Sequence, residues 1–130
     1  MKKTISIINA VLFAFIMMIS FPSLAQKAAA SDQGKKTTVN GEVLDMQCYT
    51  SGGAHGADHK ACAQKCIKGG APIGLLDKDG NTILLVQDEE NPGDYPKLAD
   101  YAGDKVTVTG TLYNRGGMKS MVVATVAVSK

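Results

Sequence analysis

The stretch PIGLLDKDGNTILLVQD, residues 72–88, holds two apolar runs separated by the dipeptide Asp79-Gly80. An Asp-Gly pair between apolar runs favours a tight turn between antiparallel strands, because glycine readily adopts the backbone angles that such a turn requires. The stretch therefore predicts a β-hairpin in the middle of the chain. The other predicted elements lie on both sides of this hairpin in the sequence.

Further strands are predicted on both sides of the hairpin. On its N-terminal side, Val39 and Val43 share one face of a run that has Gly41 between them, which indicates a first strand with a bend or bulge at the glycine. On its C-terminal side, residues 104–117 alternate apolar and polar side chains and then turn at NRGG. Residues 118–128 follow as a last strand rich in valine.

Two helical segments interrupt these strands. The run DHKACAQKCIKGG, residues 58–70, predicts a short helix that Asp58 caps at its N-terminus and that Gly69 and Gly70 end. A second short helix is predicted within NPGDYPKLADYAG, residues 91–103, after a group of turn residues.

The order of these elements predicts a mainly β fold. It matches a small five-stranded, OB-like Greek-key barrel, with a Cys-rich helical insert at residues 46–70 after strand 1 and a short helix before strand 4. The hairpin at residues 103–117 resembles the fourth and fifth strands of secreted OB-type domains. A small open sandwich is the alternative that the same alternation permits. Residues 37–130 are expected to form this single domain.

The N-terminus has the features of a secretory signal peptide. Lys2 and Lys3 precede an apolar run at residues 5–21, and small residues follow, with cleavage expected after Ala25. The apolar run is at the short end of what a membrane-spanning helix needs. Residues 1–25 are therefore assigned to a signal peptide, and the protein is expected to be exported, either periplasmic or secreted, with no membrane anchor after processing.

Beyond the signal, residues 26–36 are polar and predict a flexible lead-in. The chain after Ala25 keeps all 12 acidic residues and loses Lys2 and Lys3 from the 14 basic ones, so its formal charge is zero. All three phenylalanines lie in the signal, and the remaining aromatic residues are the four tyrosines. A neutral chain with few aromatic side chains that could stack on bases argues against a nucleic-acid partner. The sequence is compatible with an unidentified protein partner.

Every cysteine and every histidine of the chain lies within residues 48–66. On the predicted helix, His59, Cys62 and Cys66 are spaced i, i+3 and i+7, so they lie on one face. Cys48 lies at the end of the predicted first strand, and a glycine-rich loop between it and the helix allows it to approach that face. The resulting Cys3His set suits zinc or Cu(I) and predicts a metal-binding domain.

Met46 and His55 are possible additional ligands because they are near the cluster in the sequence. No cysteine is followed directly by histidine, so no haem is expected. Apart from the cluster there is no nucleophile next to a base and no phosphate-binding glycine loop, so the sequence argues against an enzyme and leaves catalytic residues unassigned.

Two other functions remain open. An exported protein meets oxidising conditions, so a disulfide between Cys48 and either Cys62 or Cys66 is the rival of a metal site, and it would leave one cysteine over. Such a chain would be a disulfide-stapled thiol-redox or protein-interaction module. A ligand-binding OB-type barrel for glycans or peptides is a third hypothesis, which rests on fold analogy alone.

The string GEVLDMQCYTSGGAHGADHKACAQKCIKGGAPIGLL, residues 41–76, resembles a signature of small exported bacterial proteins of largely uncharacterised function. In that signature, three cysteines and one histidine occupy the positions of Cys48, Cys62, Cys66 and His59. The resemblance implies that the cluster is a feature of the family. It brings no activity, metal or partner with it.

Overall fold

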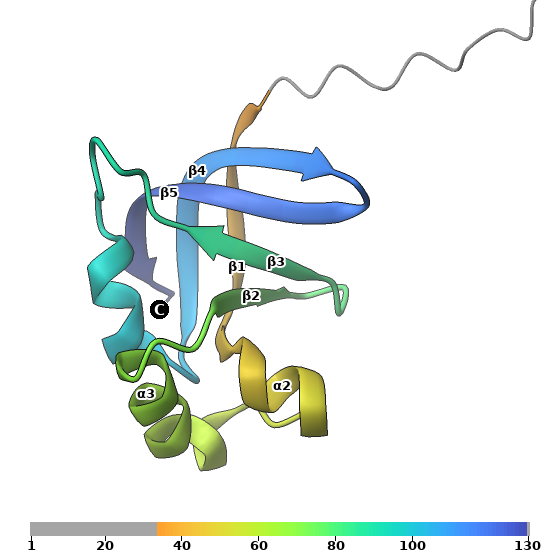
Figure 1. Ribbon diagram of the computed structural model, residues 1–130, viewed down its shortest axis with the longest axis vertical. Helices are drawn as coiled ribbons and strands as arrows, with labels where there is room; N and C mark the ends of the chain where they lie inside the picture. The colour runs from red at the N-terminus through yellow and green to blue at the C-terminus, as the bar shows by residue number, and fades with distance from the viewer. Residues whose placement is uncertain (1–33, 130) are drawn as a thin grey trace, which may run out of the picture. The chain divides into compact units, whose positions relative to one another are not determined.

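The structure is a computed structural model and describes residues 34–129. Five strands form a closed barrel in the order β1-β2-β3-β5-β4 (Figure 1). They are β1 (Lys35–Asp45), β2 (Ile73–Asp77), β3 (Thr82–Val86), β4 (Lys105–Arg115) and β5 (Met118–Val128). β3 and β5 run parallel, and the other neighbouring pairs are antiparallel. The predicted mainly β, OB-like barrel is confirmed, and the strands do not form an open sandwich.

The barrel closes through β1, which is long enough to pair with two neighbours. Its residues 35–42 pair with β4, and its residues 41–45 pair with β2. Gly41 lies where these two pairings overlap, and a Cβ there would press against the carbonyl oxygen of Leu76. The predicted bend at Gly41 is therefore a close approach of two strands, whereas the register break lies between Thr109 and Gly110 in the pairing of β4 with β5.

The core is aliphatic, as expected for a chain with no Phe or Trp after residue 25. Alternate residues of the strands point into the barrel, and the short 3₁₀ helix η3 (Tyr95–Tyr101) places Leu98 among them. The fully buried large side chains with no charged group are those of Val43, Leu44, Leu75, Leu85, Leu98, Val106, Val108, Met121 and Val123. Burial of such side chains is the main contribution to the stability of a domain of this size.

The predicted hairpin at Asp79-Gly80 joins β2 to β3. Gly80 has a φ of 80°, in the left-handed region that glycine adopts without strain. The carboxylate of Asp77 accepts hydrogen bonds from the backbone N–H groups of Asp79 at 2.9 Å and Asn81 at 2.8 Å. The turn is thus held by a side chain at the end of the strand that precedes it.

The insert after β1 contains one helix that the sequence does not predict. β1 ends at Asp45, and α2 (Met46–Gly52) begins at once, so Cys48 lies on a helix and not at the end of a strand. The Asp45 carboxylate caps this helix by accepting hydrogen bonds from the backbone N–H groups of Gln47 and Cys48. Gly53, with a φ of 68°, ends it.

The second part of the insert is the predicted helix with a different start. A 3₁₀ turn, η2 (Ala57–His59), leads into α3 (Lys60–Lys68). Asp58 does not cap α3, because Asp58 lies within the preceding turn and His59 occupies the cap position without a side-chain hydrogen bond. The end of the helix matches the prediction, since the N–H of Gly69 donates to the carbonyls of Lys65 and Cys66.

The predicted segments near the N-terminus fall largely outside the described residues. The signal peptide, the cleavage position after Ala25 and residues 26–33 all lie outside them. β1 begins at Lys35, so the expected end of the lead-in at residue 36 is two residues too far along the chain. The reason is that Lys35 and Lys36 extend the pairing with β4, opposite Leu112 and Thr111.

Candidate metal centre

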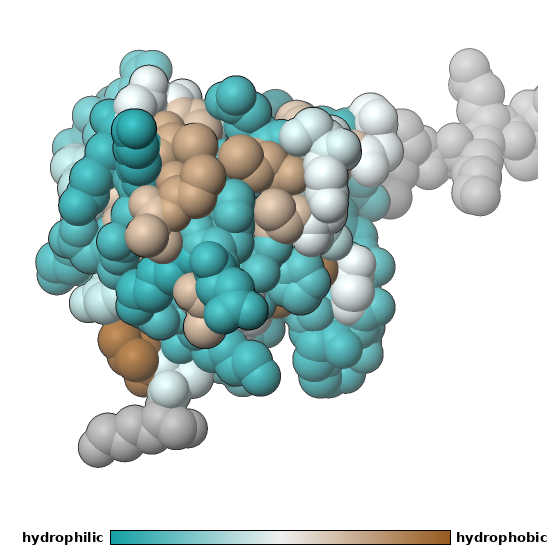
Figure 2. Space-filling model, turned by 90° about the horizontal axis from the view of Figure 1, so that it is seen from below, coloured by the Kyte–Doolittle hydropathy of each residue, from teal (hydrophilic) through white to brown (hydrophobic). Residues whose placement is uncertain are grey.

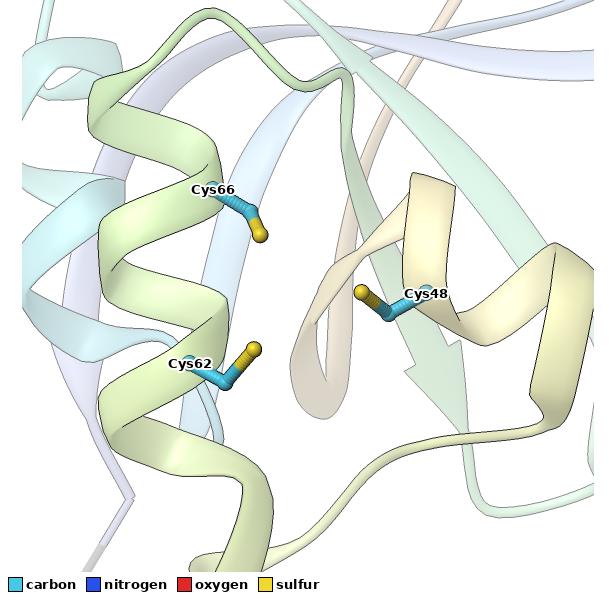
Figure 3. A group of neighbouring side chains, drawn as sticks. All are labelled: Cys48, Cys62 and Cys66. Carbon is cyan, nitrogen blue, oxygen red and sulfur yellow. The ribbon is translucent and has the colours of Figure 1, made fainter.

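Three cysteine side chains converge between the two helices of the insert. Cys48 projects from α2, and Cys62 and Cys66 project from α3 toward it (Figure 3). Their sulfur atoms all lie within 4.8 Å of one another. Sulfur ligands of a tetrahedral zinc ion are about 3.8 Å apart, since each Zn–S bond is about 2.3 Å long. The limit of 4.8 Å is about 1 Å above that separation, so the three thiols are near the spacing of zinc ligands.

The packing of α3 explains why its cysteines face α2. Ala63 and Ile67, four residues apart, are buried against the barrel. Cys62 and Cys66 form the neighbouring stripe of the helix, one residue earlier in each turn. Lys60 holds the start of α3 to the barrel through an ion pair with Asp104, with a nitrogen–oxygen distance of 2.5 Å. The apolar stripe and the ion pair together fix the direction of the cysteine stripe.

Asp45 lies behind the thiols and is the only buried charged side chain among the described residues, with 1% of its surface exposed. Burial by itself would raise the pKa of the Asp45 carboxyl. Polar contact with the Cys48 thiol and the hydrogen bonds from the backbone N–H groups of Gln47 and Cys48 outweigh burial, so the pKa lies below its ordinary value. Asp45 therefore places a negative charge next to the cysteines.

This charge acts on the two nearest thiols. Polar contact with Asp45, followed by burial, raises the pKa of Cys48 to about 12. Burial, followed by contact with Asp45, also raises the pKa of Cys66. Both effects favour the protonated thiol in the metal-free chain. A bound cation would replace the thiol protons and offset the negative charge, so the same arrangement that disfavours a free thiolate favours a metal.

His59 belongs to a second group of candidate ligands. Asp45, Cys48 and His59 each offer one ligand atom, and these three atoms lie within 4.8 Å of one another. His59 Nε2 is 3.9 Å from Asp45 Oδ2, which is too long for a hydrogen bond. Both atoms are buried, and neither has a hydrogen-bond partner. Cys48 is the one residue that the two groups share.

The two further ligands considered from the sequence point elsewhere. The side chain of Met46 packs against Gly74 of β2, where a Cβ would collide with its sulfur. His55 is half exposed, with Nδ1 3.5 Å from Glu42 Oε2. Glu42 also accepts a hydrogen bond from the backbone N–H of Gly56. His55 and Glu42 therefore hold the loop between α2 and η2 against β1, and His55 belongs to neither of the two ligand groups.

The centre is close to the molecular surface. Cys62 is exposed, Cys48 and Cys66 are half-buried, and all three cysteines are free. The face that carries the insert is largely hydrophilic, with separate hydrophobic areas among polar side chains (Figure 2). A metal ion or an alkylating reagent can therefore reach at least one of the three sulfur atoms directly.

Sequence reasoning identified the three cysteines and His59 but missed Asp45. The available signal was an aspartate near the end of the predicted first strand, three residues before a cysteine. Aspartate is common at such positions as a cap or turn residue. Only the path of the chain shows that this carboxylate is buried beside the thiols.

Comparisons with protein-family models, curated proteins and solved structures found no match to this chain. Within residues 34–129, no helix combines the length and apolar character needed to cross a membrane.

Proposed function

We propose that this protein is an exported metal-binding domain that holds a thiophilic ion, zinc or Cu(I), through the thiolates of Cys48, Cys62 and Cys66. One observation carries the proposal: three sulfur atoms from two separate helices meet within 4.8 Å. Thirteen residues separate Cys48 from Cys62, so local chain geometry alone does not bring them together. Three soft donors at this spacing suit both ions.

Export is supported by the N-terminal sequence, with its two lysines, apolar run and small residues before Ala25. An oxidising compartment makes thiols prone to disulfide formation. A metal that binds all three cysteines would protect them from oxidation. An exported chain with an odd number of cysteines would then need no disulfide to a second chain.

The thiol-redox module is the second candidate, because three sulfur atoms this close can also form a disulfide after a small movement. Reactive cysteines usually have a lowered pKa, which increases the fraction of thiolate. Here the pKa values of Cys48 and Cys66 are raised. These directions favour the metal-binding proposal over the redox one.

The ligand-binding barrel has less support. The larger pocket of the barrel wall lies among residues of β1, β2 and β4, including Asn40, Leu76 and Thr107. A second pocket lies between Met46, the β2–β3 turn and the start of β5. Neither is lined by tyrosine. A glycan site would be expected to present aromatic faces, so these pockets do not favour a glycan-binding barrel.

A competition titration tests the proposed function. The reduced chain is mixed, without oxygen, with Zn²⁺ or Cu(I) and a chromophoric chelator of known affinity. The wild-type chain is expected to withdraw metal from the chelator. Cys62→Ser should weaken binding by more than the roughly 10- to 100-fold that follows loss of an outer-shell partner, since a direct ligand is lost.

Ala61→Ser is the matched control, because Ala61 is exposed on the same helix and the substitution introduces the same hydroxyl. It should bind metal as the wild type does. A wild-type chain that leaves all of the metal on the chelator would overturn the proposal. Equal affinities of wild type and Cys62→Ser would overturn the assignment of the ligands.

A further inference from the structure

The two groups of candidate ligands define two positions for a metal ion. One position lies among the sulfur atoms of Cys48, Cys62 and Cys66, and the other lies among ligand atoms of Asp45, Cys48 and His59. Only the Cys48 sulfur belongs to both. Five donors arranged in this way exceed the four that a tetrahedral ion takes, so one ion bound to the three sulfurs would leave donors of the second group unused.

The Asp45 and His59 atoms have a separation that suits coordination. Ligands of zinc at bond lengths of about 2.0 to 2.2 Å lie about 3.4 Å apart in a tetrahedral site. His59 Nε2 and Asp45 Oδ2 are 3.9 Å apart, beyond hydrogen-bond range and close to this value. Both atoms are buried without a hydrogen-bond partner, which is costly for polar groups. A cation between them would satisfy both.

The space beside these atoms is narrow. Asp45 and His59 line a small, partly open cavity together with His55 and Gly56 of the preceding loop, and the cavity does not admit a water-sized sphere. Cys48 is not among its lining residues. A divalent ion is smaller than a water molecule. The loop is held over the cavity by Glu42, through the hydrogen bond from the N–H of Gly56.

Charge also favours two ions over one. Three thiolates and the Asp45 carboxylate carry four negative charges, and a single divalent ion would leave two of them uncompensated. Asp45 is fully buried and Cys48 and Cys66 are half-buried, so an excess charge there would be poorly solvated. Two divalent ions would neutralise the set, with neutral His59 as the fifth donor.

We propose that the chain binds a second divalent ion through Asp45, Cys48 and His59, with the Cys48 sulfur bridging it to the ion held by the three cysteines. This inference rests on the proposed function, because the bridging thiolate belongs to both ions. Loading the centre releases the three thiol protons and changes no oxidation state. The oxygen and nitrogen donors of the second position suit zinc better than Cu(I).

Native mass spectrometry of the reduced chain, titrated with Zn²⁺, tests the proposal through stoichiometry. The wild type is expected to bind two zinc ions. Asp45→Asn should bind one. Its amide oxygen can still accept the capping hydrogen bonds of α2, whereas its amide nitrogen would replace Oδ2 and cannot bind a metal. His59→Gln should also bind one, and it leaves the cap of α2 unchanged. Glu89→Gln, which changes an exposed carboxylate that belongs to neither ligand group, is the control and should bind two.

Replacing zinc with ¹¹³Cd²⁺ provides a second measurement. Two cadmium resonances with a mutual coupling through the shared sulfur are expected in the wild type, and one resonance is expected in Asp45→Asn and in His59→Gln. A wild type that binds one zinc ion overturns the second position while leaving the proposed function intact, whether or not Asp45→Asn retains that ion. A wild type that binds none overturns both.

Discussion

The carboxylate of Asp45 accepts a hydrogen bond from the backbone N–H of Cys48, with a nitrogen–oxygen distance of 3.4 Å, and the sulfur of Cys48 lies within 4.8 Å of a ligand atom of Asp45. Asp45 is thus the last residue of β1 and the N-cap of α2, the helix that carries Cys48. Its carboxylate also places a negative charge beside the thiols. The position of Cys48 depends on this residue.

Loss of the Asp45 cap should destabilise the metal-free chain. Asp45→Ala removes both capping hydrogen bonds of α2, and we expect the free energy of unfolding to fall by about 0.5 to 2 kcal/mol relative to Asp45→Asn, which keeps a capping acceptor. Both variants remove the buried charge, so the difference between them isolates the cap. Urea unfolding followed by circular dichroism, with chelator present, measures it. Equal stabilities would contradict the capping role.

Zinc should stabilise the fold through the cysteines. A ligand that binds only the folded chain adds about 2.7 kcal/mol to the unfolding free energy when its free concentration is 100 times its dissociation constant. We expect zinc to raise the melting temperature of the wild type and of Ala61→Ser, and excess chelator to reverse the rise. Cys62→Ser should show a clearly smaller rise, because the variant loses one of the three sulfur ligands and keeps the donors of Asp45, Cys48 and His59. A similar zinc-induced rise in Cys62→Ser would place the stabilising ion elsewhere.

Acid should weaken the contact between η3 and β5. Asp94 binds Lys97 Nζ at 2.6 Å and accepts a hydrogen bond from the N–H of Val126 at 3.0 Å. Contact with Lys97, followed by the Val126 bond, lowers the pKa of Asp94 below its ordinary value of 3.8. The unfolded chain therefore binds the proton more readily than the folded chain. The contribution of the Asp94 carboxylate to the free energy of unfolding is complete above the ordinary pKa and is lost as the pH falls through the lower folded-state pKa.

Asp94→Asn tests this dependence. Its unfolding free energy should fall less steeply than that of the wild type between about pH 5 and about pH 2, because the variant has no carboxyl at position 94 to protonate. Urea unfolding at a series of pH values measures both slopes. Parallel curves for the two proteins would show that Asp94 contributes nothing to the acid sensitivity.

The register break in the barrel should require glycine. A Cβ at Gly110 would collide with the carbonyl oxygen of Val122 on β5, so Gly110→Ala is expected to cost about 1 to 3 kcal/mol. Gly52 lies in α2, and a Cβ there would have no neighbouring atom within 4 Å, so Gly52→Ala should be neutral or stabilising by up to about 1 kcal/mol. Thermal unfolding of the two variants compares them, and a neutral Gly110→Ala would contradict the close approach.

The barrel was predictable because its signals are local. The Asp79-Gly80 turn and the alternation of residues 104–117 each define a hairpin from neighbouring residues. α2 was missed because it carries no such local signal: MQCYTSG has no apolar periodicity, and the adjacent glycines at 52 and 53 are typical of a loop. The helix depends on the Asp45 cap and on the backbone hydrogen bond from Met46 to the carbonyl of Pro72, which is distant in the sequence.

The candidate site was predictable only in part. The spacing of Cys62 and Cys66 on one helix face follows from the helical period, and the structure places both as expected. The proximity of Cys48 depends on how α2 and α3 pack. His59 lies in the 3₁₀ turn that precedes α3, and it forms a group with Asp45 and Cys48 in place of Cys62 and Cys66. No local pattern predicts that turn.

Alkylation with iodoacetamide, read by native mass spectrometry, tests the central claim that the three cysteines bind one metal centre. We expect the zinc-loaded chain to keep its metal and to resist alkylation at Cys48, Cys62 and Cys66 together, and all three to become reactive when chelator removes the metal. A chain without metal, with a mass two protons lower and one reactive cysteine, would contradict the claim and identify a disulfide-stapled protein instead.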